Sequence, residues 1–153
     1  MVVQVFVVSI RSNLAEETSR TDSGDREIKE EFEKGLLVLI EPDVSVRDAL
    51  TLLLQSRGWS VRTATSCEEL KAALGQGGLT AVISESTLPD CTAPEILELC
   101  SSQGLPVVFT GHDLPLQGAV DLIRQGAMDF LDKPFPQARL VDLLERLSNR
   151  QNG

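Results

Sequence analysis

The stretch that decides the fold is GLLVLIEPDVSVRDALTLLLQSRGWSVRTA, residues 35–64. It begins with a short apolar run, Leu36 to Ile40, and ends with a second strand-like run, Trp59 to Ala64. Between them Gly58 marks the end of a helix, whose apolar residues recur at the spacing of one helix face: Val46, Leu50, Leu53 and Leu54. A strand, a helix and a strand in this order predict two parallel strands joined by a crossover helix.

The same alternation continues along the rest of the chain. We predict three more strands, at Thr80 to Ser84, Pro106 to Thr110 and Asp129 to Leu131. Four more helices are expected: one that opens with the capping box Ser66-Cys-Glu-Glu69, one from about Ala93 to Ser102, one from about Leu116 to Arg124, and one that carries Leu140, Leu143, Leu144 and Leu147. The sequence therefore predicts an α/β domain over residues 35–150, with (βα)5 order and a doubly wound, five-stranded parallel sheet.

The residues before this domain have a different composition. Residues 11–34 are rich in charge and poor in large apolar side chains, so we interpret residues 1–34 as a mobile N-terminal extension. Ile28 and Phe32 are four residues apart, as in one or two helical turns. The opening MVVQVFVVSI lacks the basic start and the cleavage site of a signal peptide. The sequence leaves open whether these ten residues form an edge strand or are unstructured.

Composition excludes several classes of protein. With 153 residues and 42% hydrophobic content, the chain can form one core and is too short for two typical domains. A net charge of −9 and a pI near 4.6 argue against binding nucleic acid or an anionic membrane. No apolar run reaches the length of a membrane span. The three cysteines include no C-x-x-C pair, which argues against a zinc site, and we expect reduced thiols in a cytoplasmic protein.

Polar residues follow the predicted strands, at the edge of the sheet where α/β proteins bind ligands. Glu41-Pro42-Asp43 follow the first strand, Glu85 the third, Thr110-Gly111-His112 the fourth, and Asp132-Lys133-Pro134 the fifth. Because the carboxyl ends of parallel strands share one edge, we expect acids, a hydroxyl and an amine to converge there.

These residues resemble the receiver domain of two-component response regulators. The matching stretches are VLIEPDVSVRDAL, ISESTLP, VVFTGH and GAMDFLDKPF, which together span most of residues 35–150. The resemblance implies a flavodoxin-like sheet with strand order 2-1-3-4-5. It also implies that an aspartate after the third strand accepts a phosphoryl group from a sensor kinase, with Mg²⁺ held by that aspartate and an acidic pair. Lys133 and Pro134, Thr110 and Phe130 match the family's lysine-proline step, switch hydroxyl and switch aromatic.

The sequence departs from the family at two positions. Glu85 stands where the phosphoacceptor aspartate is expected, and Pro42 replaces the second member of the acidic pair, so that position has no side-chain oxygen. Glu41 and Glu85 are then weak candidates for metal ligands, and we expect no cofactor, since Mg²⁺ favours a fuller set of oxygen ligands. Asp43 is expected to cap the first helix of the domain rather than to bind a metal ion.

Glutamate carries its carboxylate one C–C bond farther from the backbone than aspartate does, by about 1.5 Å. We hypothesise that Glu85 reaches toward Lys133 and Thr110 and imitates part of the phosphorylated state. The chain is then a stand-alone pseudo-receiver and not an enzyme. It would bind a protein partner, such as a sensor kinase or a downstream effector, or form a homodimer through the fourth helix, fifth strand and fifth helix.

Other interpretations stay open at this point. Glu85 could be a relic without a role, or the chain could be a genuine phosphorelay receiver that uses Glu85 or another acid; Asp90, the nearest acid, lies beyond the Leu88-Pro89 turn. A hydrolase would need a nucleophile and a base, and His112 has no visible orienting partner. A DNA-binding regulator would need a helix-turn-helix segment and positive charge.

Overall fold

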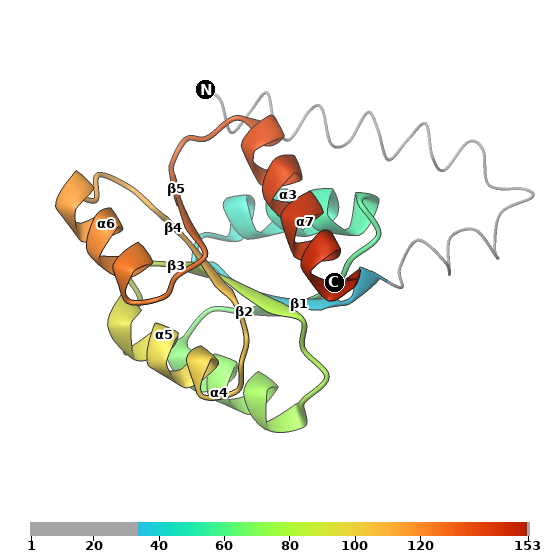
Figure 1. Ribbon diagram of the computed structural model, residues 1–153, viewed down its shortest axis with the longest axis horizontal. Coiled ribbons are helices and arrows are strands. Elements are labelled where there is room, and N and C mark those ends of the chain that lie inside the picture. Colours follow the sequence, from blue (N-terminus) through green and yellow to red (C-terminus); the bar gives the residue numbers. More distant parts are fainter. Residues whose placement is uncertain (1–33, 153) are drawn as a thin grey trace, which may run out of the picture.

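The sheet contains five parallel strands in the order β2-β1-β3-β4-β5. In this computed structural model, residues 34–152 are described (Figure 1). The strands are β1 (Leu36–Ile40), β2 (Ser60–Ala64), β3 (Ala81–Glu85), β4 (Val107–Gly111) and β5 (Asp129–Asp132). The strand order is the one that the resemblance implies, and it confirms the doubly wound α/β fold. The predictions for residues 1–33, including the helical turns near Ile28 and Phe32, lie outside the described residues.

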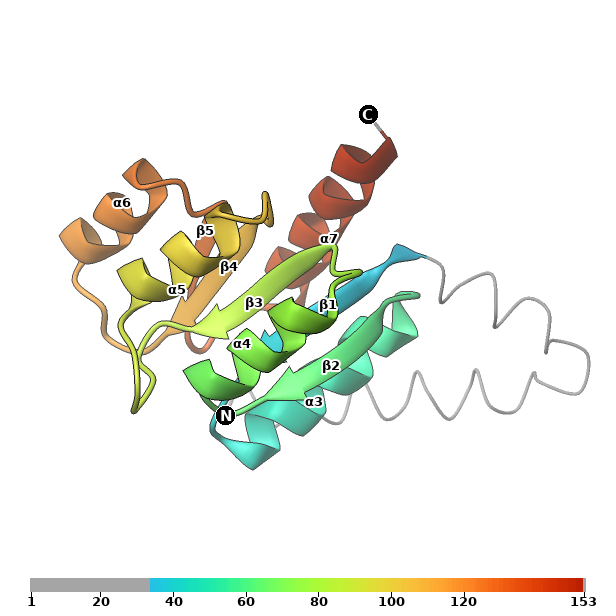
Figure 2. The same ribbon diagram turned by 90° about the horizontal axis from the view of Figure 1, so that it is seen from below.

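Helices cover both faces of the sheet. Their bounds are α3 (Val44–Ser56), α4 (Cys67–Gln76), α5 (Ala93–Ser101), α6 (Leu116–Arg124) and α7 (Gln137–Asn152). Helices α3 and α7 lie on one face, whereas α4, α5 and α6 lie on the other, as the two views in Figures 1 and 2 show. Across residues 34–152, no helix combines the length and the apolar character that crossing a membrane requires.

The alternation of side chains along β1 builds the two halves of the core. Leu37 and Leu39 pack with α3 and α7, while Val38 and Ile40 pack with α4 and α5. A strand buried on both faces needs an uninterrupted apolar run, and the run in β1 is of that kind. Because all five strands are parallel, their carboxyl ends lie at one edge of the sheet, and the polar residues follow there.

Two local predictions need correction. The strand ends shift by one residue: Trp59, Thr80 and Pro106 precede their strands, whereas β3 includes Glu85 and β4 includes Gly111. The capping box at α4 is only half formed, because Ser66 accepts from the backbone N–H of Glu69 while the Glu69 carboxylate binds Thr65 instead of the backbone of Ser66. Thr65 provides two donors, its backbone N–H and its hydroxyl, so the Glu69 carboxylate binds Thr65 in preference to the single N–H of Ser66.

Candidate functional site

Pairing of the strands brings the predicted site residues to one edge. Glu41 follows β1 directly, Glu85 is the last residue of β3, and Lys133 follows β5. Glu85 lies beside Thr110 of β4 in the sheet register. The backbone N–H of Lys133 donates to the carbonyl of Gly111 at 2.7 Å, which fixes the start of the lysine beside β4.

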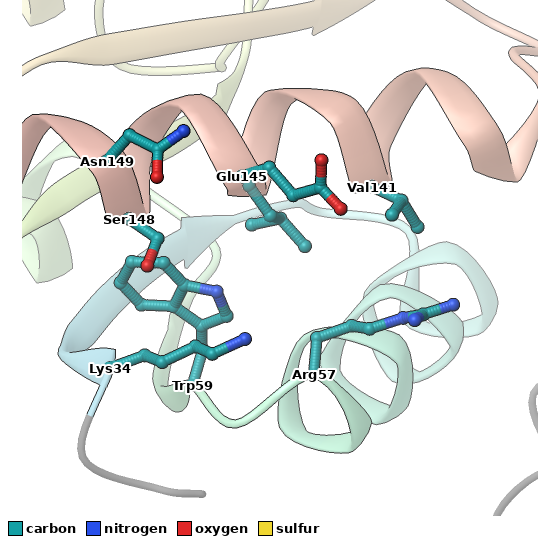
Figure 3. Close-up of a pocket in the computed structure, with 8 residues that line it drawn as sticks. Lys34, Arg57, Trp59, Val141, Glu145, Ser148 and Asn149 are labelled. Atoms are coloured by element: carbon teal, nitrogen blue, oxygen red, sulfur yellow. The ribbon is translucent and has the colours of Figure 1, made fainter.

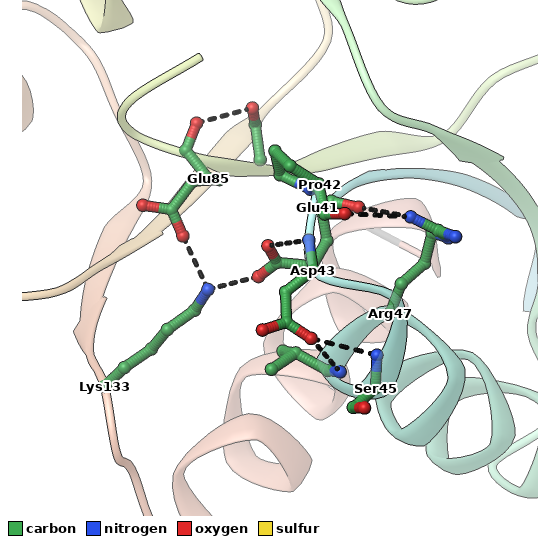
Figure 4. A network of polar contacts seen from close by, with 9 residues as sticks. Glu41, Pro42, Asp43, Ser45, Arg47, Glu85 and Lys133 are labelled. Atoms are coloured by element: carbon green, nitrogen blue, oxygen red, sulfur yellow. Dashed lines mark hydrogen bonds and ion pairs between the residues drawn. The ribbon is translucent and has the colours of Figure 1, made fainter. Parts of the chain in front are cut away.

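The ammonium group of Lys133 lies between two carboxylates. Its Nζ donates to Oε1 of Glu41 and, at 2.5 Å, to Oε2 of Glu85 (Figure 4). The side chains of Glu41, Lys133 and Glu85 are 3%, 5% and 12% exposed. Burial lowers the pKa of Lys133, but the hydrogen bonds and negative charges of Glu41 and Glu85 outweigh this, so the pKa is raised above the ordinary lysine value. We call these three residues the carboxyl-end triad.

The second oxygen of Glu41 is also engaged. Oε2 accepts from the backbone N–H of Asp43 at 3.1 Å. Asp43 in turn caps α3, since its Oδ1 accepts from the backbone N–H groups of Ser45 at 2.9 Å and Val46 at 3.2 Å. The guanidinium of Arg47 donates to the carbonyl oxygen of Glu41 at 2.9 Å. The capping role predicted for Asp43 is confirmed, and the loop after β1 is held by its own side chains.

The aromatic candidate lies against a glycine of the neighbouring strand. A Cβ atom added to Gly111 would stand 3.1 Å from Cζ of Phe130 and 2.5 Å from Oγ of Ser86. Thr110 is buried, and its carbonyl oxygen accepts from the backbone N–H of Ser86 at 2.7 Å. Only a residue without a side chain lets Phe130 approach this closely.

The remaining sequence candidates take no part in the hydrogen bonds of the triad. Pro42 and Pro134 are exposed, and the peptide bond between Lys133 and Pro134 is cis. His112 is exposed in the loop after β4. The carboxylate of Asp90 accepts from the backbone N–H groups of Cys67 at 2.9 Å and Glu68 at 3.2 Å, at the start of α4. These hydrogen bonds keep the pKa of Asp90 below its usual value.

Sequence reasoning missed the ion pair between Glu41 and Lys133. Both residues were placed at the same edge of the sheet, which is the signal that could have found the pair. Among residues 34–152, no three histidine, cysteine, aspartate or glutamate side chains are grouped as a metal site. The three cysteines Cys67, Cys91 and Cys100 are free thiols.

Comparison with known proteins gives consistent results. The response regulator receiver domain family matches residues 37–145. The transcriptional regulatory protein FixJ of Bradyrhizobium diazoefficiens is 34% identical over 116 residues, which cover 73% of this chain and 56% of FixJ. The C4-dicarboxylate transport transcriptional regulatory protein DctD of Pseudomonas aeruginosa is 37% identical over 114 residues, which cover 72% of this chain and 24% of DctD.

A solved structure shows the same fold. The response regulator receiver domain protein of Clostridium thermocellum superposes with a TM-score of 0.72 at 20% identity, over 77% of this chain and 97% of that chain. The chain spans about half the length of FixJ and about a quarter of the length of DctD.

Proposed function

Because the chain belongs to the response regulator receiver domain family, we propose that it is an atypical receiver which signals by binding a protein partner without aspartyl phosphorylation. The observation that carries the proposal is the contact of Lys133 with Glu85, which stands at the phosphoacceptor position. A carboxylate on this lysine supplies part of the negative charge that a phosphoryl group would bring. Glu85 is then a permanent, partial mimic of the phosphorylated state.

The donor set does not fit a bound Mg²⁺ ion, which requires several oxygen ligands in octahedral geometry. The ammonium group of Lys133 lies between Glu41 and Glu85. Pro42 has no side-chain oxygen, and the carboxylate of Asp43 is engaged in the cap of α3. These contacts support a role without a metal ion, and no step of the proposed function involves one. The proposed role is that of a non-enzymatic signalling protein in the cytoplasm.

The position of Phe130 supports the same proposal. Its ring lies against Gly111, which follows Thr110 in β4. Gly111 is also close to Ser86, which follows Glu85 at the end of β3. The ring is partly buried against the core on the α4–α6 face of the sheet, which supports a position that packing sets. Glu85 favours the active conformer only modestly, because a carboxylate carries less charge and fewer acceptor oxygens than a phosphoryl group.

We place the partner surface on α6, β5 and α7. Leu116 and Ile123 of α6 are 81% and 47% exposed. Asp129 of β5 binds Arg146 of α7 at 2.7 Å. Apolar side chains beside fixed charges suit a sensor kinase, an effector or a second copy of the chain. Leu116→Ser should weaken such an association, as measured by sedimentation for a dimer or by calorimetry with an identified partner.

Attempted phosphorylation is the direct test. The full chain is incubated with Mg²⁺ and acetyl phosphate, and its intact mass is measured; we expect no phosphoryl adduct. The double variant Pro42→Asp and Glu85→Asp restores the family's acids and should become phosphorylated only when Mg²⁺ is present. A stoichiometric adduct on the native chain would contradict the proposal and favour a phosphorelay receiver that uses Glu85 or another acid.

The mimic is tested separately with Glu85→Gln, which removes the charge and keeps the size of the side chain. We expect the NMR signals of Thr110 and Phe130 to shift, because Lys133 loses an ionic partner. Glu98→Gln, an exposed substitution on α5, is the matched control. Unchanged Thr110 and Phe130 signals in Glu85→Gln would show that Glu85 is a relic.

A further inference from the structure

Two cysteine thiols meet between α4 and α5, outside the carboxyl-end triad. These two helices lie side by side (Figure 1). A cavity of about 420 Å³ lies between them, and both Cys67 and Cys91 line it. The charged residues of its lining are Lys71, Asp90, Glu95 and Glu98. Cys67 is buried, Cys91 is half-buried, and both are free thiols. The cavity therefore holds two reduced sulfur atoms that the proposed function does not use.

The backbone holds the two cysteines next to each other. Cys67 is the first residue of α4, and its backbone N–H donates to Oδ1 of Asp90 at 2.9 Å. Oδ2 of Asp90 accepts from the backbone N–H of Glu68 at 3.2 Å. Because Asp90 directly precedes Cys91, these hydrogen bonds fasten the chain before Cys91 to the start of α4.

The chain after Cys91 is fixed as well. The hydroxyl of Thr92 accepts from the backbone N–H of Glu95 at 3.4 Å, and the carboxylate of Glu95 accepts from the backbone N–H of Thr92 at 3.4 Å. Thr92 also pairs with Thr87 in a short antiparallel bridge. Cys91 thus lies between two anchored residues, so little conformational freedom is lost when its sulfur forms a bond.

The two side chains are in contact, since a hydrogen bond joins the thiols of Cys67 and Cys91. Burial and the neighbouring Cys67 raise the pKa of Cys91 to about 12, and the negative charges of Asp90 and Glu95 add to this effect. Because the thiolate is the form that attacks disulfides, Cys91 reacts slowly at neutral pH. The pair stays reduced until it is exposed to sustained oxidation, as is usual for redox-sensing thiols of the cytoplasm.

We propose that Cys67 and Cys91 form a reversible modification site, at which a small disulfide compound converts the two thiols into a disulfide bond. The thiolate of Cys91 attacks one sulfur of the compound, whose S–S bond breaks, and the released thiolate takes up the proton that Cys91 lost. Cys67 then loses its proton and attacks the sulfur of Cys91, which releases the second small thiol with that proton. The two cysteines lose two hydrogen atoms, and the compound gains them.

The new bond would join α4 to the loop that follows β3. This loop begins directly after Glu85, so oxidation would fasten the chain beside the carboxyl-end triad. The reaction needs only the two thiols and does not depend on the charge of Glu85. The site is therefore independent of the proposed function at the carboxyl end.

Hydroxyethyl disulfide is a suitable probe, because it is small and neutral. The full chain is equilibrated with mixtures of hydroxyethyl disulfide and mercaptoethanol, quenched with acid, and measured by intact mass and peptide mapping. We expect a loss of two hydrogen atoms and a link between the peptides of Cys67 and Cys91. The effective concentration of the two thiols for each other should lie well above the millimolar values of groups joined by a flexible chain. A millimolar value, or a mixed disulfide that persists on Cys91, would overturn the proposal.

Variants identify the pair. Cys100 of α5 is fully buried, and Cys100→Ala is the matched control that should form the same disulfide with an unchanged effective concentration. Cys91→Ser alters one atom of a half-buried side chain and should abolish the intramolecular disulfide. Cys67→Ala should leave only a mixed disulfide on Cys91. If Cys91→Ser still lost two hydrogen atoms, the oxidised pair would be Cys67 and Cys100, and the proposal would be wrong.

The rate of oxidation gives a second test. Loss of the reduced chain should accelerate about tenfold per pH unit from about pH 8 to 10, because the thiolate fraction of Cys91 rises over this whole range. An exposed thiol would level off near its ordinary pKa of about 8.5. A rate that levels off there would show that Cys91 does not react from its buried contact with Cys67, and the proposal would fail.

Discussion

The two ends of the sheet treat their charged side chains in opposite ways. At the carboxyl end, Lys133 binds both Glu41 and Glu85, and all three are largely buried. At the amino end, Lys34 and Arg57 are exposed and form no ion pair within the described part of the chain. The carboxyl end thus pairs its charges with one another, whereas the amino end leaves two cations without an ionic partner among residues 34–152.

The largest effect is expected from Lys133→Met. This change leaves two carboxylates facing each other without the cation between them, and loss of one partner from a buried ionic group costs about 3–5 kcal/mol. Urea unfolding followed by the fluorescence of Trp59 measures the change. Lys71→Met, at an exposed position of α4, is the control and should stay within about 0.5 kcal/mol of the native chain. Similar costs for both variants would show that the triad is not desolvated.

A smaller effect separates the two acids of the triad. Glu41→Gln should destabilise the fold more than Glu85→Gln, because Glu41 is the more buried and also accepts from the backbone N–H of Asp43. Each change weakens hydrogen bonds to a charged group, which corresponds to about 1–3 kcal/mol. Unfolding of the two single variants and the double variant measures this order, and a larger cost for Glu85→Gln would reverse our description of the triad.

Alkaline pH gives a third test of the triad. The folded-state pKa of Lys133 lies above the ordinary lysine value of about 10.4, so its stabilising contribution is present in full below that pH and is lost as pH rises through the folded-state pKa. The difference in unfolding free energy between the native chain and Lys133→Met should therefore stay constant from about pH 7 to 10 and shrink above that range. A difference that shrinks below about pH 9 would contradict a raised pKa.

The cysteine thiols do not change the pH dependence of this difference in unfolding free energy. Burial raises the pKa of Cys100 to about 12. Burial and the neighbouring Cys67 raise the pKa of Cys91 to about 12. Because unfolded thiols ionise near pH 8.5, stability falls as pH rises above that value. Both chains carry the same cysteines, so this loss cancels in their difference.

The sequence predicted the carboxyl end of the sheet better than the amino end. Strand β1 was predicted to the residue, because its apolar run lies between Gly35 and the Glu41-Pro42 step. The contact of Glu85 with Lys133 was predicted from the resemblance to receiver domains and from the length of glutamate, and it is confirmed. The contact of Glu41 with Lys133 was missed, since the conformation of a lysine side chain is set by tertiary packing and not by sequence spacing.

A cavity of about 210 Å³ between α7 and Trp59, at the amino end of the sheet, could not be predicted in this way (Figure 3). The cavity depends on how α7 lies over Trp59. Its lining residues come from the first part of the domain, residues 34–59, and from its last helix, residues 141–149. The apolar periodicity of α7 predicted that Leu144 is buried, and this is confirmed. It could not predict which residues of the other segments would lie beside Trp59, because that depends on tertiary packing.

The smallest effect on stability is expected at the amino end of the sheet. Lys34→Gln and Arg57→Gln should each change the unfolding free energy by less than about 0.5 kcal/mol, since neither side chain is buried or paired among the described residues. Urea unfolding measures this at the same ionic strength as for Lys133→Met. Charges that hold the fold together are already bound to each other, and their removal costs stability. Charges without a partner contribute little to stability, so a small change for Lys34→Gln and Arg57→Gln beside a large change for Lys133→Met is the result that distinguishes the two ends.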